Sequence, residues 1–176
     1  MAWRSQSCKR PSYPTAIWSM TYHLVYADAT AKELLRAAYQ VRQRAYAPYS
    51  NFKVGAAFRA KENSREIFTG CNVENAAFTP TSCAERTAIT KAVSEGYRQF
   101  SSGAVVAYKP DVFISPCGVC RQFIREFAGS TDIPIYIAQA NDAQSQQEQQ
   151  EEPFNSDDPI LCTSIFNLLP HSFHTY

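Results

Sequence analysis

Residues 82–90 read SCAERTAIT, and residues 115–123 read SPCGVCRQF. Each stretch opens with a serine, which favours the N-cap of a helix, and continues into a helical spacing of apolar residues. The sequence therefore predicts two helices, 82–97 and 115–127, with cysteines in their first turns. A helix N-terminus lowers the pKa of a nearby thiol, so these cysteines are predicted to form the thiolates that bind metals.

The first predicted helix also places a carboxyl group on its inner face. Glu85 is followed by Ala88, Ala92 and Val93 at helical offsets, so these residues share one stripe. Apolar stripes face the core, and Glu85 is therefore predicted to be buried. A buried carboxylate is costly unless it is paired or functional, which makes Glu85 a candidate catalytic residue.

Three cysteines are candidates for one metal site. Cys117 and Cys120 are i, i+3 neighbours, and Phe123 extends their stripe, so the pair is predicted to face the interior. Together with Cys83 they offer soft ligands, for which zinc is the natural cation. Catalytic zinc sites keep three protein ligands and leave the fourth position to water. Glu85 beside such a site is suited to act as a proton shuttle.

Two other interpretations of the cysteines stay open at this point. A structural zinc site would close with a fourth ligand, for which Cys71 and Cys162 are available. A Cys-x-x-Cys pair by itself is also typical of a redox dithiol. The joint pattern of a carboxyl group and cysteines at two helix starts favours the catalytic interpretation.

The rest of the chain predicts an α/β fold. A helix is expected with Thr30 as its N-cap and Glu33 in a capping box, ending before Pro48, and a hairpin of strands 52–60 and 67–73 follows. Further strands are expected at 104–108, 133–138 and 160–166. A hairpin followed by alternating helices and strands predicts a three-layer α/β/α fold with a mixed five-stranded sheet and helices on both faces.

The predicted domain occupies residues 30–176. Residues 1–29 are expected to be a flexible N-terminal extension, whose composition weakly resembles a mitochondrial transit peptide. The tract at 139–158 holds six acidic residues and no lysine or arginine. It is predicted to be a disordered insertion, too polar to bury anything.

Composition narrows the function classes. Lys+Arg number 17 against 16 Asp+Glu, and the chain has no apolar run of lipid-spanning length, so neither a nucleic-acid nor a membrane partner is expected. The six cysteines come without a secretory signal, which favours a reducing compartment, the cytoplasm.

These motifs resemble the cytidine deaminase family, in its free-nucleoside, three-cysteine zinc form. The Cys-x-Glu and Pro-Cys-x-x-Cys elements are the known signature of zinc nucleobase deaminases. Further similarity lies in YSNF at 49–52, GCNVENA at 70–76 and LLP at 168–170. The resemblance runs from about residue 31 to 173, interrupted by the tract at 139–158.

The resemblance implies Cys83, Cys117 and Cys120 as Zn²⁺ ligands, Glu85 as the catalytic proton shuttle and Arg86 as a donor to the thiolates. The implied substrate-binding residues are Phe52, Asn72, Glu74, Asn75, Ala76, Phe78, Ala84 and Phe173. Asn72 and Glu74 would bind the ribose hydroxyls, although such residues are also common in turns at strand ends. Phe52 would stack near the base, and Phe173 would reach a neighbouring subunit, although each aromatic is also compatible with an ordinary core position.

The sequence departs from the family pattern at Phe78. Phe78 stands where many relatives carry tyrosine, so a hydroxyl contact is lost there.

The implied activity is hydrolytic deamination of cytidine and 2'-deoxycytidine to uridine and 2'-deoxyuridine plus ammonia, by a homotetramer in pyrimidine salvage. The alternatives are a polynucleotide cytosine deaminase, an antibiotic-nucleoside deaminase, and a structural zinc module for protein interaction. A polynucleotide enzyme predicts a basic channel with aromatic platforms, which the sequence does not clearly show.

Overall fold

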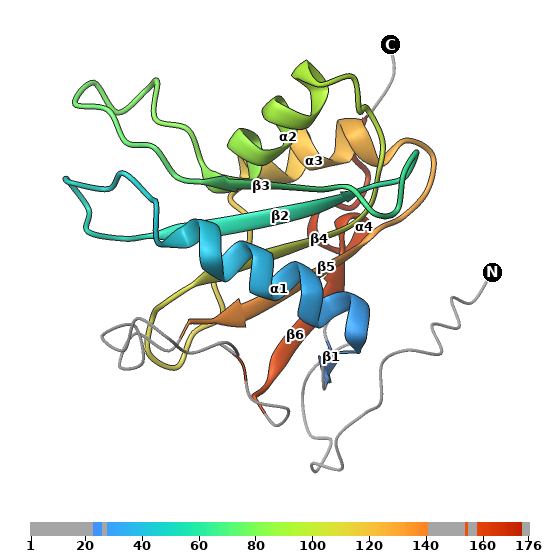
Figure 1. Ribbon diagram of the computed structural model, residues 1–176, viewed down its shortest axis with the longest axis horizontal. Helices are drawn as coiled ribbons and strands as arrows, with labels where there is room; N and C mark the ends of the chain where they lie inside the picture. The colour runs from blue at the N-terminus through green and yellow to red at the C-terminus, as the bar shows by residue number, and fades with distance from the viewer. Residues whose placement is uncertain (1–22, 26–27, 141–153, 155–157, 174–176) are drawn as a thin grey trace.

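The computed structural model describes residues 23–25, 28–140, 154 and 158–173. Within them the sheet has six strands in the order β1-β6-β5-β4-β2-β3 (Figure 1). The strands are β1 His23–Val25, β2 Val54–Ala60, β3 Ile67–Cys71, β4 Phe100–Ala107, β5 Pro134–Gln139 and β6 Ile160–Ser164. The β4–β5 pair is parallel and the other pairs are antiparallel, so the predicted mixed sheet is confirmed. All five predicted strands are present, and β1 adds a sixth from the stretch assigned to the extension.

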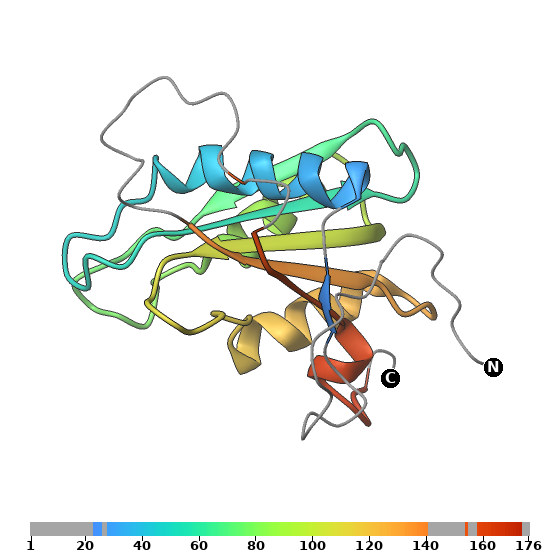
Figure 2. The same ribbon diagram turned by 90° about the horizontal axis from the view of Figure 1, so that it is seen from below.

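The helices lie on both faces of this sheet. They are α1 Ala29–Arg42, α2 Ala84–Ser94, α3 Gly118–Ala128 and α4 Ile165–Leu168. Figure 2 shows α1 on one side of the sheet and α3 and α4 on the other. Buried residues of α1 form one core cluster with the sheet, and those of α2 and α3 form a second. The three-layer α/β/α prediction is therefore confirmed.

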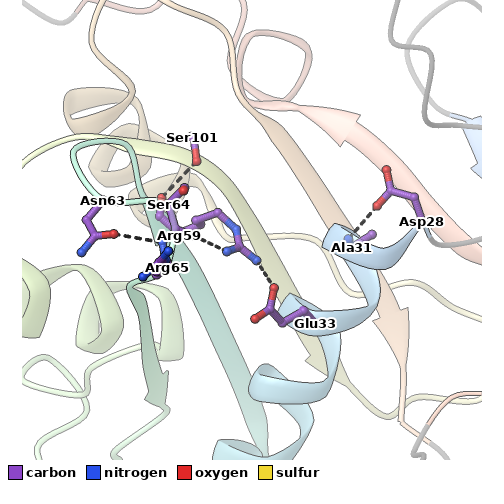
Figure 3. Close-up of polar contacts among 8 residues, drawn as sticks. All are labelled: Asp28, Ala31, Glu33, Arg59, Asn63, Ser64, Arg65 and Ser101. Atoms are coloured by element: carbon purple, nitrogen blue, oxygen red, sulfur yellow. Dashed lines mark hydrogen bonds and ion pairs between the residues drawn. The ribbon is translucent and has the colours of Figure 1, made fainter.

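The start of α1 differs from the prediction. Its N-cap is Asp28, whose carboxylate accepts a hydrogen bond of 2.8 Å from the backbone N–H of Ala31, so the predicted Thr30 cap is wrong. The predicted capping-box residue, Glu33, pairs instead with Arg59 of β2 (Figure 3). An earlier carboxylate cap outcompetes the threonine because it satisfies the same exposed backbone donors and also complements the helix dipole.

Two elements near the C-terminus also differ from the prediction. β6 ends at Ser164, whose hydroxyl accepts from the Asn167 N–H at 3.2 Å and caps α4, so Phe166 lies in a helix and not in the strand. Within the polar tract, Phe154 is half-buried and packs on Tyr39 of α1, with ring centroids 5.8 Å apart. The expectation that the tract is disordered and buries nothing is therefore wrong at Gln139, which ends β5, at Ala140, which is buried in the core, and at Phe154. Residues 141–153 and 155–157 lie outside the described part.

Gly70 sets the distance between β3 and α2. A Cβ atom built on Gly70 would lie 2.3 Å from the backbone nitrogen of Ala88 and 2.5 Å from the carbonyl oxygen of Ala84. Real Cβ atoms do not approach backbone this closely, so only glycine permits the observed packing. The start of α2, which carries Cys83 and Glu85, is held in place by this contact.

We therefore expect Gly70→Ala to destabilise the protein by about 1–3 kcal/mol or more, because the added methyl group must push α2 off the sheet. The matched control is Gly118→Ala in α3, where a Cβ atom would meet nothing within 4 Å. Urea unfolding of both variants measures the difference. Equal unfolding free energies for the two variants would contradict this packing argument.

No helix in the described part of the chain combines the length and apolarity that crossing a membrane requires.

Candidate active site

Three sulfur atoms from two helix starts converge at one point. Cys83 is the N-cap of α2, Cys117 is the N-cap of α3, and Cys120 lies in the first turn of α3. Their Sγ atoms all lie within 4.8 Å of one another, and those of Cys83 and Cys117 are 4.0 Å apart. The predicted serine caps are wrong, since both helices begin later than expected. Neither N-cap cysteine makes a side-chain capping bond, which leaves the sulfurs available to a metal.

The spacing of these sulfurs fits a zinc ion. Ligands held tetrahedrally at the usual Zn–S distance lie about 3.8 Å apart, close to the observed Cys83–Cys117 separation. Among the described residues the group contains neither Cys71 nor Cys162, the fourth ligands that a structural site would need. A tetrahedral ion held by this group therefore takes its fourth ligand from elsewhere, as catalytic zinc sites do.

The sulfur cluster is also electrostatically prepared for a cation. Hydrogen bonding with Cys120 and with Arg86 lowers the pKa of Cys83 to about 5, although burial opposes this change. The pKa of Cys120 is raised, mainly by its hydrogen bond to Cys83 and by burial. Without metal, the hydrogen bonds within this group therefore favour a thiolate among its sulfurs. Cys120 is buried as predicted, whereas Cys117 is exposed, contrary to the expectation that the pair faces inward together.

Arg86 is directed at this charge. Its guanidinium donates to the Thr81 carbonyl oxygen at 2.7 Å and to the Cys83 sulfur at 3.9 Å. Burial lowers its pKa, but the hydrogen bond to Cys83 and the thiolate charges outweigh burial and raise the pKa overall. Thr81 went unnoticed in the sequence, because its backbone carbonyl and not its side chain makes the contact.

Glu85 is buried beside the sulfurs, with 4% of its surface exposed, as the helical stripe predicted. Burial raises its pKa to about 7, and the charge of Cys83 adds to this effect, while a hydrogen bond to its own backbone N–H opposes it. Glu85 is not a member of the cysteine group. The arrangement thus places a carboxyl group that exchanges a proton near neutral pH next to a metal site.

This shifted pKa makes the stability of the metal-free protein depend on pH. The pKa of Glu85 is about 7 in the fold against a reference of 4.5, so the folded protein holds a proton that the unfolded chain releases between these values. Its ionisation therefore reduces stability progressively as pH rises from about 4.5 to 7. Glu85→Gln removes this penalty. We therefore expect the difference in unfolding free energy, variant minus parent, to be about 3 kcal/mol larger at pH 7.5 than at pH 4.5. Urea unfolding of the zinc-stripped proteins at both pH values tests this; a difference that does not change with pH would contradict it.

Asn72 connects the end of the β2–β3 hairpin to the preceding loop. It is buried, its side-chain oxygen accepts from the Val54 N–H at 2.8 Å, and its amide nitrogen donates to the Phe52 carbonyl at 2.8 Å. The Asn72 side chain can still make further hydrogen bonds, because its amide group keeps a second hydrogen and a second lone pair. Asn72 therefore positions the backbone of Phe52, whose side chain is half-buried.

Glu74 holds the same loop two residues further on. Its carboxylate accepts from the backbone N–H of Tyr49 at 2.9 Å and of Ser50 at 3.2 Å, and also from the Ser50 hydroxyl. The bond from the Ser50 hydroxyl is the main cause that lowers the pKa of Glu74. The role of Ser50 was missed, since nothing local in the sequence indicates a partner that lies 24 residues away.

The remaining predicted substrate residues occupy two regions. Asn75, Ala76 and Phe78 lie in the exposed loop after β3, where Phe78 is 71% exposed and its ring centroid is 6.0 Å from that of Tyr49. Ala84 is buried in the first turn of α2. Phe173 is 58% exposed, and its carbonyl oxygen accepts from the Gln122 side chain of α3 at 3.0 Å.

Comparison with known proteins agrees with this site. Residues 28–136 match the family described as "Cytidine and deoxycytidylate deaminase zinc-binding region". A cytidine deaminase of Sporosarcina psychrophila is 47% identical over 106 residues, which cover 60% of this chain and 75% of that protein. A probable cytidine deaminase of Dictyostelium discoideum is 50% identical over 96 residues, which cover 54% of this chain and 64% of that protein.

The chain is also similar to solved structures of cytidine deaminases. The crystal structure of a cytidine deaminase from Burkholderia pseudomallei has a TM-score of 0.64 and 38% identity, covering 80% of this chain and 97% of that chain. The structure of a cytidine deaminase from Mycobacterium tuberculosis has a TM-score of 0.61 and 30% identity, covering 84% of this chain and 100% of that chain. The chain therefore belongs to the cytidine and deoxycytidylate deaminase family, and the matched segment is the zinc-binding region that contains Cys83, Cys117 and Cys120.

Proposed function

We propose that this protein is a zinc-dependent cytidine deaminase, which hydrolyses cytidine and 2'-deoxycytidine to uridine and 2'-deoxyuridine with release of ammonia, a reaction of pyrimidine salvage. The observation that carries the proposal is the position of Glu85, a buried carboxyl group with a pKa of about 7 that lies two residues after one member of a three-sulfur group. A structural zinc module has no need of such a group, because burial of an unpaired carboxyl is costly.

Cys83, Cys117 and Cys120 are the proposed ligands, and Glu85 is the proposed proton shuttle. When bound, Zn²⁺ supplies the Lewis acidity that lowers the pKa of a water molecule toward neutrality. Glu85 takes a proton from water and delivers it to the ring nitrogen beside the carbon that bears the amine. A C–O bond forms at that carbon, the C–N bond breaks, and a proton passed through Glu85 leaves with the ammonia. Arg86 moderates the negative charge of the thiolates by donating to Cys83.

Asn72 and Glu74 are the proposed ribose-binding residues. A carboxylate has about four acceptor positions. Protein donors use three of those of Glu74, so one acceptor position remains for a sugar hydroxyl. The same group thus organises the loop at Ser50 and binds the sugar.

We expect Glu74→Gln to raise KM for cytidine about tenfold or more, since a hydrogen bond to a charged acceptor is lost. Ser50→Ala is the matched control, because it disturbs the loop but leaves the carboxylate in place. Its KM is expected to rise less. Equal increases in steady-state KM for both variants would confine Glu74 to a role in the loop.

Five further residues are proposed to contact the nucleoside. Phe52 stacks near the base, Ala84 offers its backbone to the pyrimidine edge, and Asn75, Ala76 and Phe78 line the loop side. Phe173 is proposed to reach the site of a neighbouring subunit in a homotetramer, and its exposed ring supports this. Light scattering would measure the oligomer, and a monomeric protein with full activity would contradict the shared site.

We also propose that residues 23–176 form the catalytic domain, because β1 pairs with β6 and Asp28 caps α1, and that residues 1–22 are an extension. The protein is proposed to work in the cytoplasm, where a reducing environment keeps its thiolates available.

The decisive experiment follows the loss of cytidine ultraviolet absorbance with and without a zinc chelator. Cytidine and 2'-deoxycytidine are expected to be converted, the chelator to abolish conversion, and a cytosine-containing oligonucleotide to remain unchanged. Turnover of the oligonucleotide alone would indicate a polynucleotide deaminase. Turnover of a cytosine-nucleoside antibiotic alone would indicate the antibiotic-nucleoside enzyme, and inactivity of the zinc-loaded protein on every substrate would indicate a structural zinc module.

A further inference from the structure

Arg121 directly follows Cys120 in α3, and its guanidinium group makes three hydrogen bonds. Nε donates to the Pro116 carbonyl oxygen at 2.8 Å, one terminal nitrogen donates to the Ser115 hydroxyl at 3.0 Å, and the other donates to the Leu168 carbonyl oxygen at 3.0 Å. Every nitrogen of the group is thus engaged, in the planar geometry that a guanidinium holds without further ordering.

Two of these contacts fall on the residues just before Cys117. The segment between Ala107, where β4 ends, and Gly118, where α3 begins, contains no helix or strand, so no ladder of backbone hydrogen bonds fixes it. Cys117 is also the exposed member of the sulfur group, whereas Cys120 is buried. Arg121 therefore holds the segment that leads into the exposed cysteine of the group.

The third contact anchors the guanidinium to the body of the protein. Leu168 ends α4, where helix carbonyls lack intrahelical partners, and Arg121 satisfies one of them. Ile165 and Leu168 of α4 are buried in the core cluster shared with α2 and α3. The guanidinium thus joins the Ser115–Pro116 segment to a packed element.

We propose that Arg121 is a positioning residue for the metal site, which fixes the approach of Cys117 to zinc through Ser115 and Pro116. The inference rests on the proposed function only for the identity of the ion. The backbone N–H of Arg121 donates to the Cys117 carbonyl at 2.9 Å, as in any first helical turn, while its guanidinium bonds Ser115, Pro116 and Leu168. The guanidinium thus acts through the backbone that carries one ligand, as groups around a metal site commonly do.

Arg125, one helical turn later on α3, offers a matched control. It is buried, donates to the Ser172 hydroxyl at 3.0 Å and to the Gly129 carbonyl, and lies over the Phe166 ring at 4.7 Å. It therefore secures the C-terminal segment with the same chemistry, but its partners do not include Ser115 or Pro116.

The test measures zinc release from the full-length, zinc-loaded protein to a chromogenic chelator. Arg121→Met is expected to release zinc at least about tenfold faster than the parent protein. Arg121→Lys is expected to fall between them, because one ammonium group replaces only part of the three contacts. Arg125→Met is expected to release zinc at the parent rate.

Two results would overturn the proposal: release at the parent rate from Arg121→Met, or equally fast release from Arg125→Met, which would assign the effect to the C-terminal segment as a whole. If Arg121→Met does not fold, Ser115→Ala removes a single contact and is expected to speed release about threefold. Parent rates in both Ser115→Ala and Arg121→Lys would then overturn it. Zinc release needs no turnover, so failure of the parent protein to deaminate cytidine would count against the proposed function and leave these rates decisive for Arg121.

Discussion

Replacing Glu85 by glutamine is expected to lower the turnover number for cytidine by about 10²–10⁴-fold, the usual contribution of general acid–base transfer. Glutamine keeps the size of the side chain but can neither accept the proton from water nor hand it to the ring. Zinc is expected to stay bound, because Glu85 is not part of the three-cysteine group. The measurement is kcat from cytidine absorbance, together with zinc content per chain.

Glu95→Gln supplies the control for this experiment. Glu95 is the exposed C-cap residue of α2, so the same chemical change there leaves the site untouched and turnover at the parent level. A Glu85→Gln or Glu85→Ala protein that holds its zinc and keeps more than about a tenth of parental turnover would show that Glu85 is not the proton shuttle.

Cys120→Ser is expected to abolish zinc binding and, as a result, to lower the deaminase activity by more than about 10²-fold. Cys120 is buried in the first turn of α3, and its sulfur lies within 4.8 Å of the other two. A serine hydroxyl at this position does not ionise near neutral pH, so it cannot replace the thiolate. Zinc analysis of the purified variant and the cytidine assay measure the two losses.

The control for the cysteine experiment is the double variant Cys71→Ala, Cys162→Ala. Neither residue belongs to the sulfur group, so zinc content is expected to remain at the parental level. Loss of zinc from the double variant, together with retention of zinc in Cys120→Ser, would show that zinc is held in a closed site by different ligands.

The candidate site was predicted from sequence where its geometry is local. The spacing of Glu85 from Ala88 and Ala92 alone indicates a buried carboxyl group, and the structure confirms it. The exact helix starts were not predicted: Asp28, Cys83 and Cys117 are the N-caps in place of the expected Thr30 and two serines. Asp28 satisfies the capping preference as Thr30 would, whereas Cys83 and Cys117 make no capping bond and stand one and two residues after the expected serines. The packing of each helix on the sheet decides at which residue the helix begins.

The partners of the loop residues were beyond prediction for a different reason. Glu74 and Ser50 are 24 residues apart, and Arg121 and Leu168 are 47 apart, so no periodicity connects them. The packing of Phe154 on Tyr39 is of the same kind, because a single aromatic in a polar tract carries no pattern of its own.

By itself the sequence determined the chemistry of this protein: thiols in the first turns of two helices and a carboxyl group on an inward stripe, since those depend on the 3.6-residue period of a helix. Only the tertiary structure decided that the two helix starts meet. Their distance is set by the backbone contact of β3 and α2 at Gly70 and by the packing of α3 in the same core cluster. A metal site needs atoms a few ångströms apart, and only the packed sheet brings residues distant in sequence that close.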